Sequence, residues 1–264
     1  MIFSDITYEK DGAVAVLTFT REEKRNAVRR QTWIDIRAAL SECAADDGVR
    51  AVVITGKGKA FSAGADLEEM GEILGGGVSF FDIRRGLLEI QDVTRMMADL
   101  SKPIVTALNG YTVGAGAEIA IASDIRIAAE NATFEFAEVK VGLFETNGVT
   151  YLLPRLVGQG RAMELMLTGR RIDAREAHAI GLVSRVVKQD DLMDEAMNTA
   201  RGMAQNAPVS MALVKRCLVR SGEIGLEDAM TYETDAMMAC AMTEDAREGA
   251  TAFVERRKPK YSGR

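Results

Sequence analysis

Short apolar runs alternate with longer amphipathic stretches in the first half of the chain, and this alternation predicts strands interleaved with helices. Runs rich in Val, Ile and Ala predict buried strands over 13–19, 51–55, 104–108 and 125–128. Apolar residues at helical spacing, or small residues after a turn, predict helices over 32–45, 80–100 and 115–122. Strands that alternate with helices in this way are typical of an α/β layered domain.

The second half of the chain has mainly helical spacing. Predicted helices after residue 161 are interrupted at Gly169, Gly181, Pro208 and Gly222, and the last helix is predicted to begin with Thr243 as its N-cap. Methionine is frequent here, at Met193, Met197, Met203, Met211, Met230, Met237, Met238 and Met242. Because methionine packs adaptably, we interpret these residues as helix core or subunit interface rather than as a ligand pocket.

Glycine-rich segments occur at 55–59 and 71–77, and neither has the spacing of a phosphate-binding loop. The second contains three consecutive glycines, which predicts a mobile loop. No dinucleotide-binding fingerprint follows any predicted strand. A nucleotide cofactor held by either motif is therefore not expected.

Composition and charge narrow the function classes. The chain has 264 residues, of which 47% are hydrophobic and 27% charged, so we expect a packed soluble core. The net charge of −6 argues against a broad nucleic-acid surface. No basic segment followed by an apolar run opens the chain, and charged residues interrupt the apolar stretch over 104–129. We expect neither a signal peptide nor a membrane span.

Cysteine and histidine usage excludes several catalytic classes. Cys43, Cys217 and Cys240 are odd in number and widely spaced, which fits a reduced cytoplasmic setting and does not fit a zinc site. The one histidine, His178, lies in a predicted short surface helix that ends at Gly181. A Ser-His-Asp or Cys-His mechanism would depend on this residue, and we interpret it as solvated.

The candidate chemistry is carried by two glutamates and two small-residue turns. Glu118 lies in the segment 114–120, which predicts a turn that opens a helix, and Glu138 lies among apolar residues over 134–142. A second small-residue turn occupies 61–67. Backbone N–H groups exposed at such turns can hold a developing oxyanion, and the carboxyls can transfer protons beside it.

The ordered set of motifs resembles the crotonase, or enoyl-CoA hydratase/isomerase, superfamily. The motifs that carry the resemblance are 26–27, 54–56, 61–67, 102–110, 123–128, 167–169, 181–184 and 253–260. The resemblance implies a repeated ββα spiral core over 1–200 and a helical trimerisation region over 201–264. It also implies a coenzyme A thioester substrate, no separate cofactor or metal, and a homotrimer or a dimer of trimers.

The resemblance also implies roles for individual residues. It places the oxyanion hole at the N–H groups of Ala63 and Ala115, and the acid and base at Glu118 and Glu138. It implies substrate contacts at Lys24, Arg25, Ala27, Ala63, Gly64, Ala65, Asp66, Leu67, Ala115, Phe144 and Glu145. Lys24 and Arg25, together with the basic cluster at 256–260, are the candidate cations for the coenzyme A phosphates.

The segment after Glu138 departs from the pattern of hydratases, which commonly have a turn rich in proline and glycine there. Glu145 adds a third carboxyl, which could serve an isomerase, or could cap the next helix or shape the pocket; we favour capping or pocket shaping. The leading hypothesis is a 2-enoyl-CoA hydratase, and its nearest rival is an enoyl-CoA or dienoyl-CoA isomerase. A non-catalytic acyl-CoA-binding or RNA-binding relative, and a dehalogenase or hydrolase, are less favoured.

Overall fold

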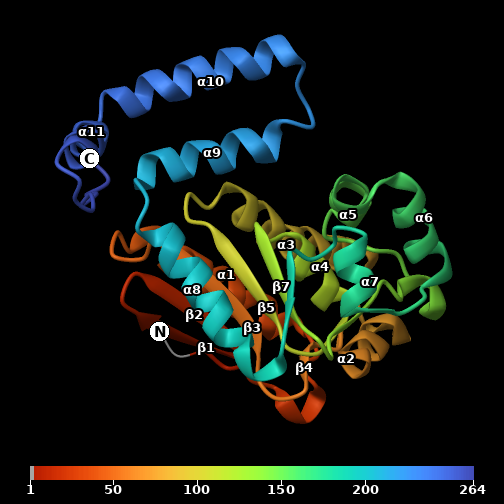
Figure 1. Cartoon of the computed structure of the whole chain (residues 1–264). Helices are drawn as coiled ribbons and strands as arrows, with labels where there is room; N and C mark the ends of the chain where they lie inside the picture. The colour runs from red at the N-terminus through yellow and green to blue at the C-terminus, as the bar shows by residue number, and fades with distance from the viewer. Residues whose placement is uncertain (1–2) are drawn as a thin grey trace.

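The computed structural model describes residues 3–264, and a six-stranded sheet forms its centre (Figure 1). The strands follow the order β1-β2-β3-β5-β7-β10, in which β1 and β2 are antiparallel and the others pair in parallel. Their bounds are Ile6–Asp11, Val14–Phe19, Ala51–Gly56, Ile104–Leu108, Ile125–Ala129 and Arg185–Val187. The four buried strands predicted from the apolar runs all lie in this sheet.

A smaller second sheet, which the hydrophobic pattern did not predict, has the order β4-β6-β8-β9. Its strands are short: Ala60–Ser62, Tyr111–Val113, Thr133–Glu135 and Ile172–Asp173. Three successive strand pairs (β3 with β4, β5 with β6, and β7 with β8) each pass from the large sheet to the small one. A strand pair followed by a helix is therefore the repeated unit.

The corners between the two sheets explain several polar and small residues. A Cβ on Gly110 would collide with the carbonyl group of Lys59, so only glycine allows this close approach of the two backbones. Asn109 joins neighbouring corners, because its amide donates to the carbonyl oxygen of Gly58 at 2.8 Å while its own oxygen accepts from the N–H of Gly56. These contacts hold consecutive repeats in register.

Helices cover both faces of the large sheet, and alternate residues of each strand point to opposite faces. On one face Val52 and Ile54 of β3 belong to the main core, which includes residues of α1 (Arg30–Ala45), α3 (Phe80–Asp99) and α4 (Ala115–Ile121). On the other face Ala51 and Val53 belong to a second cluster with residues of α8 (Leu192–Ala204). The period-two pattern therefore assigns each side chain to one of two cores.

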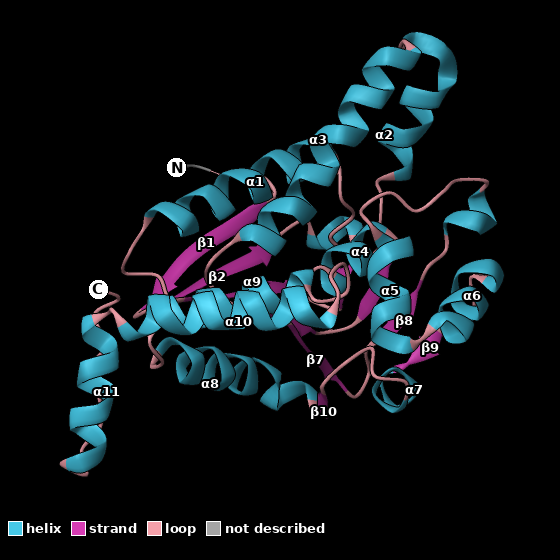
Figure 2. Ribbon diagram, turned by 90° about the horizontal axis from the view of Figure 1, so that it is seen from above, coloured by secondary structure: helices cyan, strands magenta, loops and turns pink. Residues whose placement is uncertain are grey.

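The prediction of a mobile loop over 71–77 is wrong. The helix α2 (Leu67–Glu72) continues into a π-helical turn over Ile73–Gly77, with Gly76 at a φ of 102°. Asp66 caps this helix by accepting from the N–H groups of Glu68 and Glu69. The cap and apolar residues at helical spacing outweigh the conformational cost of the glycines. Figure 2 shows α2 and the start of α3 projecting from the body of the protein.

The last helices extend away from the two sheets (Figure 1). They are α9 (Pro208–Arg220), α10 (Leu226–Ala241) and α11 (Glu244–Val254). Lys215 anchors α9 to the core, where its ammonium group donates to the carbonyl oxygen of Met97 at 2.8 Å and pairs with Asp124 at 2.8 Å. Thr243 caps α11 as predicted, because its hydroxyl oxygen accepts from the N–H of Ala246. No helix within 3–264 is both long and apolar enough to span a bilayer.

The helices α5 (Val149–Val157), α6 (Gln159–Thr168) and α7 (Ala174–Ala179) gather at one side of the molecule, at the right in Figure 1. Gly169 ends α6 in the left-handed conformation, and Gly181 follows α7 with a φ of 84°, as the predicted interruptions require. His178 is exposed on α7, in agreement with its interpretation as a solvated residue.

Candidate active site

The two small-residue turns predicted from the sequence lie directly against each other. A Cβ on Gly116 would lie 2.6 Å from the Ser62 Cβ, so glycine is what lets α4 approach the turn that follows β4. Gly114 has a φ of 47°, and a Cβ there would lie 2.5 Å from Oε1 of Glu138. The two glycines thus bring both turns and one of the glutamates to the same place.

The first turn presents a different N–H group from the predicted one. The N–H of Ala63 donates to the carbonyl oxygen of Arg25 at 2.9 Å, so it is not available to a ligand. Val28 forms a parallel bridge with Ala65, in which Val28 bonds to the carbonyl oxygen of Gly64 and to the N–H of Asp66. The N–H of Ala65 itself has no partner among the described residues. The structure therefore moves the candidate oxyanion donor from Ala63 to Ala65.

The second donor lies at the first residue of α4. The N–H of Ala115 has no acceptor within the helix, because the first N–H groups of a helix have no preceding turn to bond. Both Ala65 and Ala115 line the same cavity. Two residues whose N–H groups have no partner among residues 3–264 therefore line one cavity.

Glu118 is the more constrained of the two predicted glutamates. It lies on α4 with 2% of its surface exposed, and Oε1 accepts from the N–H of Thr146 at 2.8 Å. Its other oxygen accepts from the side-chain amide of Asn147 at 2.5 Å. Burial raises the pKa of Glu118, while these donors favour its ionised form and lower that pKa.

Glu138 begins a 3₁₀ turn over Glu138–Val141 and is half-buried. Its Oε2 atom is buried and has no hydrogen-bond partner among the described residues. The turn continues into a loop that α3 holds in place, since Gln91 and Thr94 donate to the carbonyl oxygens of Thr146 and Asn147. The same loop supplies the donors to Glu118.

Glu145 does not cap the next helix, so that part of the favoured interpretation is wrong. Gly148 is the N-cap of α5 and no side chain caps this helix. The carboxyl of Glu145 instead lies against the other two glutamates: one oxygen from each of Glu118, Glu138 and Glu145 lies within 4.8 Å of the others. Burial, followed by the proximity of Glu138, raises the pKa of Glu145 to about 10. At neutral pH this cluster therefore retains at least one proton.

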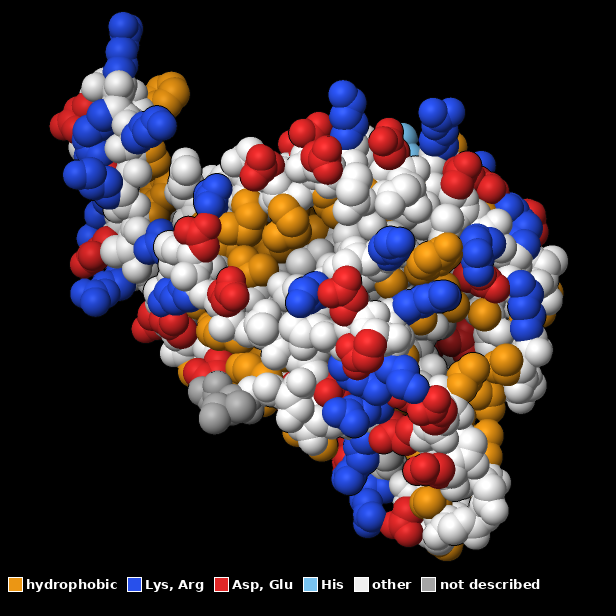
Figure 3. Space-filling view, turned by 90° about the horizontal axis from the view of Figure 1, so that it is seen from below, with side chains coloured by type: hydrophobic (Ala, Val, Ile, Leu, Met, Phe, Trp, Pro, Cys, Tyr) orange, Lys and Arg blue, Asp and Glu red, His pale blue; other side chains and the backbone are white. Residues whose placement is uncertain are grey.

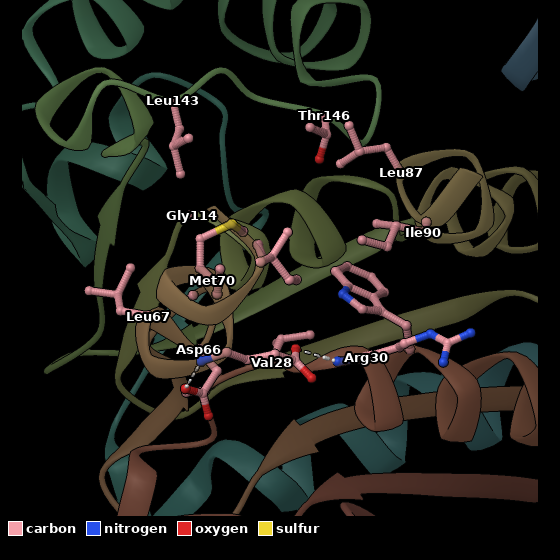
Figure 4. Close-up of a pocket in the computed structure, with 18 of the residues that line it drawn as sticks. Val28, Arg30, Asp66, Leu67, Met70, Leu87, Ile90, Gly114, Leu143 and Thr146 are labelled. Carbon is pink, nitrogen blue, oxygen red and sulfur yellow. Dashed lines mark hydrogen bonds between the residues drawn. The ribbon is translucent and has the colours of Figure 1, made fainter. Parts of the chain in front are cut away.

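A cavity of about 750 Å³ opens in front of the two turns, between the α1, α2 and α3 helices and the loop after Glu138 (Figure 4). Figure 4 shows Leu143 and Thr146 across the cavity from Asp66 and Val28. Most of the predicted substrate contacts line it, namely Lys24, Ala27, Ala63, Gly64, Ala65, Asp66, Leu67, Ala115 and Phe144. Glu118 and Glu138 also line it.

Comparisons with known proteins show the family to which this chain belongs. A family model described as enoyl-CoA hydratase/isomerase matches residues 9–264. The chain belongs to the enoyl-CoA hydratase/isomerase family. The chain is 38% identical to a short-chain-enoyl-CoA hydratase of Clostridium acetobutylicum over 98% of its length and 97% of the relative. It is 36% identical to a crotonyl-CoA hydratase of Syntrophomonas wolfei over 99% of both chains.

Solved structures of this family have the same fold. An enoyl-CoA hydratase from Bacillus anthracis matches with a TM-score of 0.93 at 33% identity, covering 99% of this chain and 100% of the other. A putative enoyl-CoA hydratase from Streptomyces coelicolor matches with a TM-score of 0.95 at 31% identity, covering 100% and 96%. The predicted superfamily and its fold, including the helices at the end of the chain, are confirmed.

Two predicted substrate contacts lie outside the cavity of this family member. The Arg25 guanidinium lies 5.9 Å from the centre of the Tyr111 ring and does not line the cavity. Glu145 is buried and does not line the cavity, although its neighbours Phe144 and Thr146 do. Lys24 lines the cavity but pairs with Glu68 at 2.8 Å.

Sequence reasoning missed several residues that shape the site. Asn147 donates to Glu118, although nothing local marks an asparagine in a loop as a partner of a distant glutamate. Trp33, Leu87 and Ile90 line the cavity from α1 and α3. Helical spacing placed Trp33 on the apolar face of its predicted helix, but it did not indicate that this face borders a cavity.

Proposed function

We propose that this chain hydrates a 2-enoyl-CoA thioester to a 3-hydroxyacyl-CoA. The observation that carries the proposal is that two unpaired N–H groups and two carboxyls, Glu118 and Glu138, line one cavity. The full-length similarity to relatives named as hydratases supports the same reaction. A non-catalytic binding protein would have no need of both carboxyls beside both donors.

The N–H groups of Ala65 and Ala115 would hold the thioester carbonyl oxygen. Negative charge grows on that oxygen as an enolate forms, and donors placed in advance stabilise it without reorganisation. Loss of one such donor costs about 3–4 kcal/mol in the transition state of well-studied enzymes. The backbone of the turn over 63–67 would then run along the pantetheine, with Lys24 as the candidate cation for a phosphate.

The two glutamates would divide the proton transfers. Glu118 would serve as the base, because the N–H donors from Thr146 and Asn147 hold its carboxyl group in one orientation. It would remove a proton from the water that attacks C3. Glu138, whose Oε2 has no hydrogen-bond partner among the described residues, would serve as the acid and deliver a proton to C2.

An enoyl-CoA or dienoyl-CoA isomerase is the second candidate, because a third carboxyl, Glu145, lies beside the pair. Incubation with crotonyl-CoA and with a 3-enoyl-CoA in heavy-oxygen water separates the two functions. Hydration places the label at C3 and removes the absorbance of the conjugated thioester, whereas isomerisation incorporates no oxygen. Isomerisation without label, and no hydration of any 2-enoyl-CoA tested, would refute the hydratase proposal.

We also propose that the protein assembles through its C-terminal helices, as a trimer or a dimer of trimers. The apolar side chains of α10 and the following residues are exposed in the single chain, including Met237 at 68% and Met242 at 74%. Figure 3 shows hydrophobic side chains gathered on the body of the protein, next to the projecting C-terminal helices. Large exposed apolar patches are uncommon on monomers and mark interfaces.

A further inference from the structure

Glu145 has a buried carboxyl group that lacks the hydrogen bonds by which buried polar groups are usually stabilised. Only 6% of the residue is exposed, and neither of its oxygens has a hydrogen-bond partner among the described residues. It does not cap α5 and it does not line the cavity. Glutamate is costly to bury in this way, so the position calls for a partner that the side chain acquires during function.

The carboxyl of Glu145 has two near neighbours. The charged groups that face it are Glu138, from the turn that precedes it, and Glu118, from α4. Two carboxyl groups can form a hydrogen bond only when one of them carries a proton. Glu145 in its acid form could therefore donate to either neighbour, and its second oxygen could accept a proton from the other.

A proton suits this cluster better than a metal ion does. The N–H groups of Thr146 and Asn147, and the side-chain amide of Asn147, already point their positive ends at the oxygens of Glu118. Those donors would repel a cation bound among the same oxygens. They would not hinder a proton held between Glu145 and Glu138.

Hydration leaves the two catalytic glutamates in the wrong protonation states for the next turnover. Under the proposed function, Glu118 ends with the proton of the water and Glu138 ends without one. We propose that Glu145 is a positioning residue that resets the pair by passing a proton from Glu118 to Glu138. The inference rests on the proposed hydratase function.

The reset is balanced in atoms and charge. The O–H bond of Glu118 breaks as its proton moves to one oxygen of Glu145, and the proton on the other oxygen of Glu145 moves to Glu138. Glu118 becomes a carboxylate, Glu138 becomes an acid, and Glu145 remains neutral. Because Glu145 is buried and does not line the cavity, product in the cavity need not leave before the exchange takes place.

Glu145→Gln tests the inference, because glutamine keeps the shape but cannot pass an acid proton. With crotonyl-CoA in excess, quenched-flow should show one product per active site formed at the wild-type rate, followed by slow turnover. We expect a steady-state rate about 10²-fold lower, at the low end for loss of a proton-transfer group. Glu145→Ala should recover part of its rate in formate buffer, which supplies a small acid.

Glu135→Gln is the matched control. Glu135 is also buried, but it pairs with Lys140 and Arg171 and is not part of the three-carboxyl cluster. Its variant should show no burst and no response to formate. If Glu145 had only a structural role, its substitution would lower the burst rate and the steady-state rate together, and formate would restore neither.

Three outcomes would overturn the inference. The first is a Glu145→Gln enzyme that turns over at the wild-type rate, and the second is an equal loss of burst and steady state. The third is wild-type activity that is lost on chelation and regained with Mg²⁺, which would assign the cluster to a cation. Failure of the proposed function is distinguishable, because the wild-type protein would then hydrate no 2-enoyl-CoA.

Discussion

Removal of the Asn147 side-chain donor is expected to make Glu118 harder to ionise. The amide of Asn147 lies 2.5 Å from Oε2 of Glu118, and the residue is 1% exposed. A hydrogen bond to a charged group contributes about 1.5–3 kcal/mol. One pKa unit corresponds to about 1.4 kcal/mol. Asn147→Ala should therefore shift the acid limb of the pH–rate profile to higher pH by about one to two units.

The assay is the hydration of crotonyl-CoA followed by loss of thioester absorbance between about pH 5 and 10. The acid limb should shift to higher pH because burial already raises the pKa of Glu118, and loss of a donor to the carboxylate raises that pKa further. At high pH, where Glu118 is ionised in both proteins, kcat/KM of the variant should approach the wild-type value.

Thr146→Ala is the control for this prediction. Thr146 donates to Glu118 through its backbone N–H, which the substitution keeps, so the acid limb should not move. A uniform loss of activity at every pH in Asn147→Ala, with the limb unchanged, would contradict the reasoning. Glu118 would then not be the base whose ionisation limits the rate.

Glu118→Gln and Glu138→Gln should each lower hydration by about 10²–10⁴-fold, and a double variant that loses the full product of both effects would show that they do not act as a unit. Gly116→Ala should lower the free energy of unfolding by about 1–3 kcal/mol and should also lower kcat, because the new Cβ would displace the turn at Ser62. Urea unfolding and steady-state kinetics measure the two effects, and a variant that loses neither stability nor kcat would contradict the close approach. Glu145→Gln should raise the melting temperature relative to wild type, by an amount that grows with pH. The pKa of Glu145 in the folded state, about 10, lies above its ordinary value of 4.5, so the folded state binds more protons than the unfolded state across that window and wild-type stability falls as pH rises. A pH-independent difference would argue against a protonated Glu145. Light scattering should show an assembly larger than a monomer at micromolar concentration, and single substitutions of the exposed methionines in α10 by glutamate should weaken it.

Local pattern predicted the four central strands β2, β3, β5 and β7 of the large sheet, because these are apolar runs whose character does not depend on their partners, whereas the exposed β1 and the short β10 lack such runs. The small sheet was not predicted, because strands such as Tyr111–Val113 are too short to show a period and form only by pairing with distant segments. The segment 71–77 was also predicted wrongly. Its glycines indicated a loop, but the helix that Asp66 caps continues through them.

The candidate site divides in the same way. Glu118, Glu138 and Ala115 could be identified from their motifs, because small residues before a helix and carboxyls among apolar residues are local features. The choice between Ala63 and Ala65 could not, because it depends on the carbonyl oxygen of Arg25, which accepts from one N–H and leaves the other without a partner.

The sequence by itself determined the superfamily, the α/β layering and the kinds of groups available for chemistry, since these depend on residue types and their order. Only the tertiary structure decided which N–H groups are unpaired among the described residues, and that Glu145 lies beside the other two glutamates with a raised pKa. Burial and the approach of charges from distant segments set the pKa of a carboxyl, and neither is a property of its neighbours in the chain.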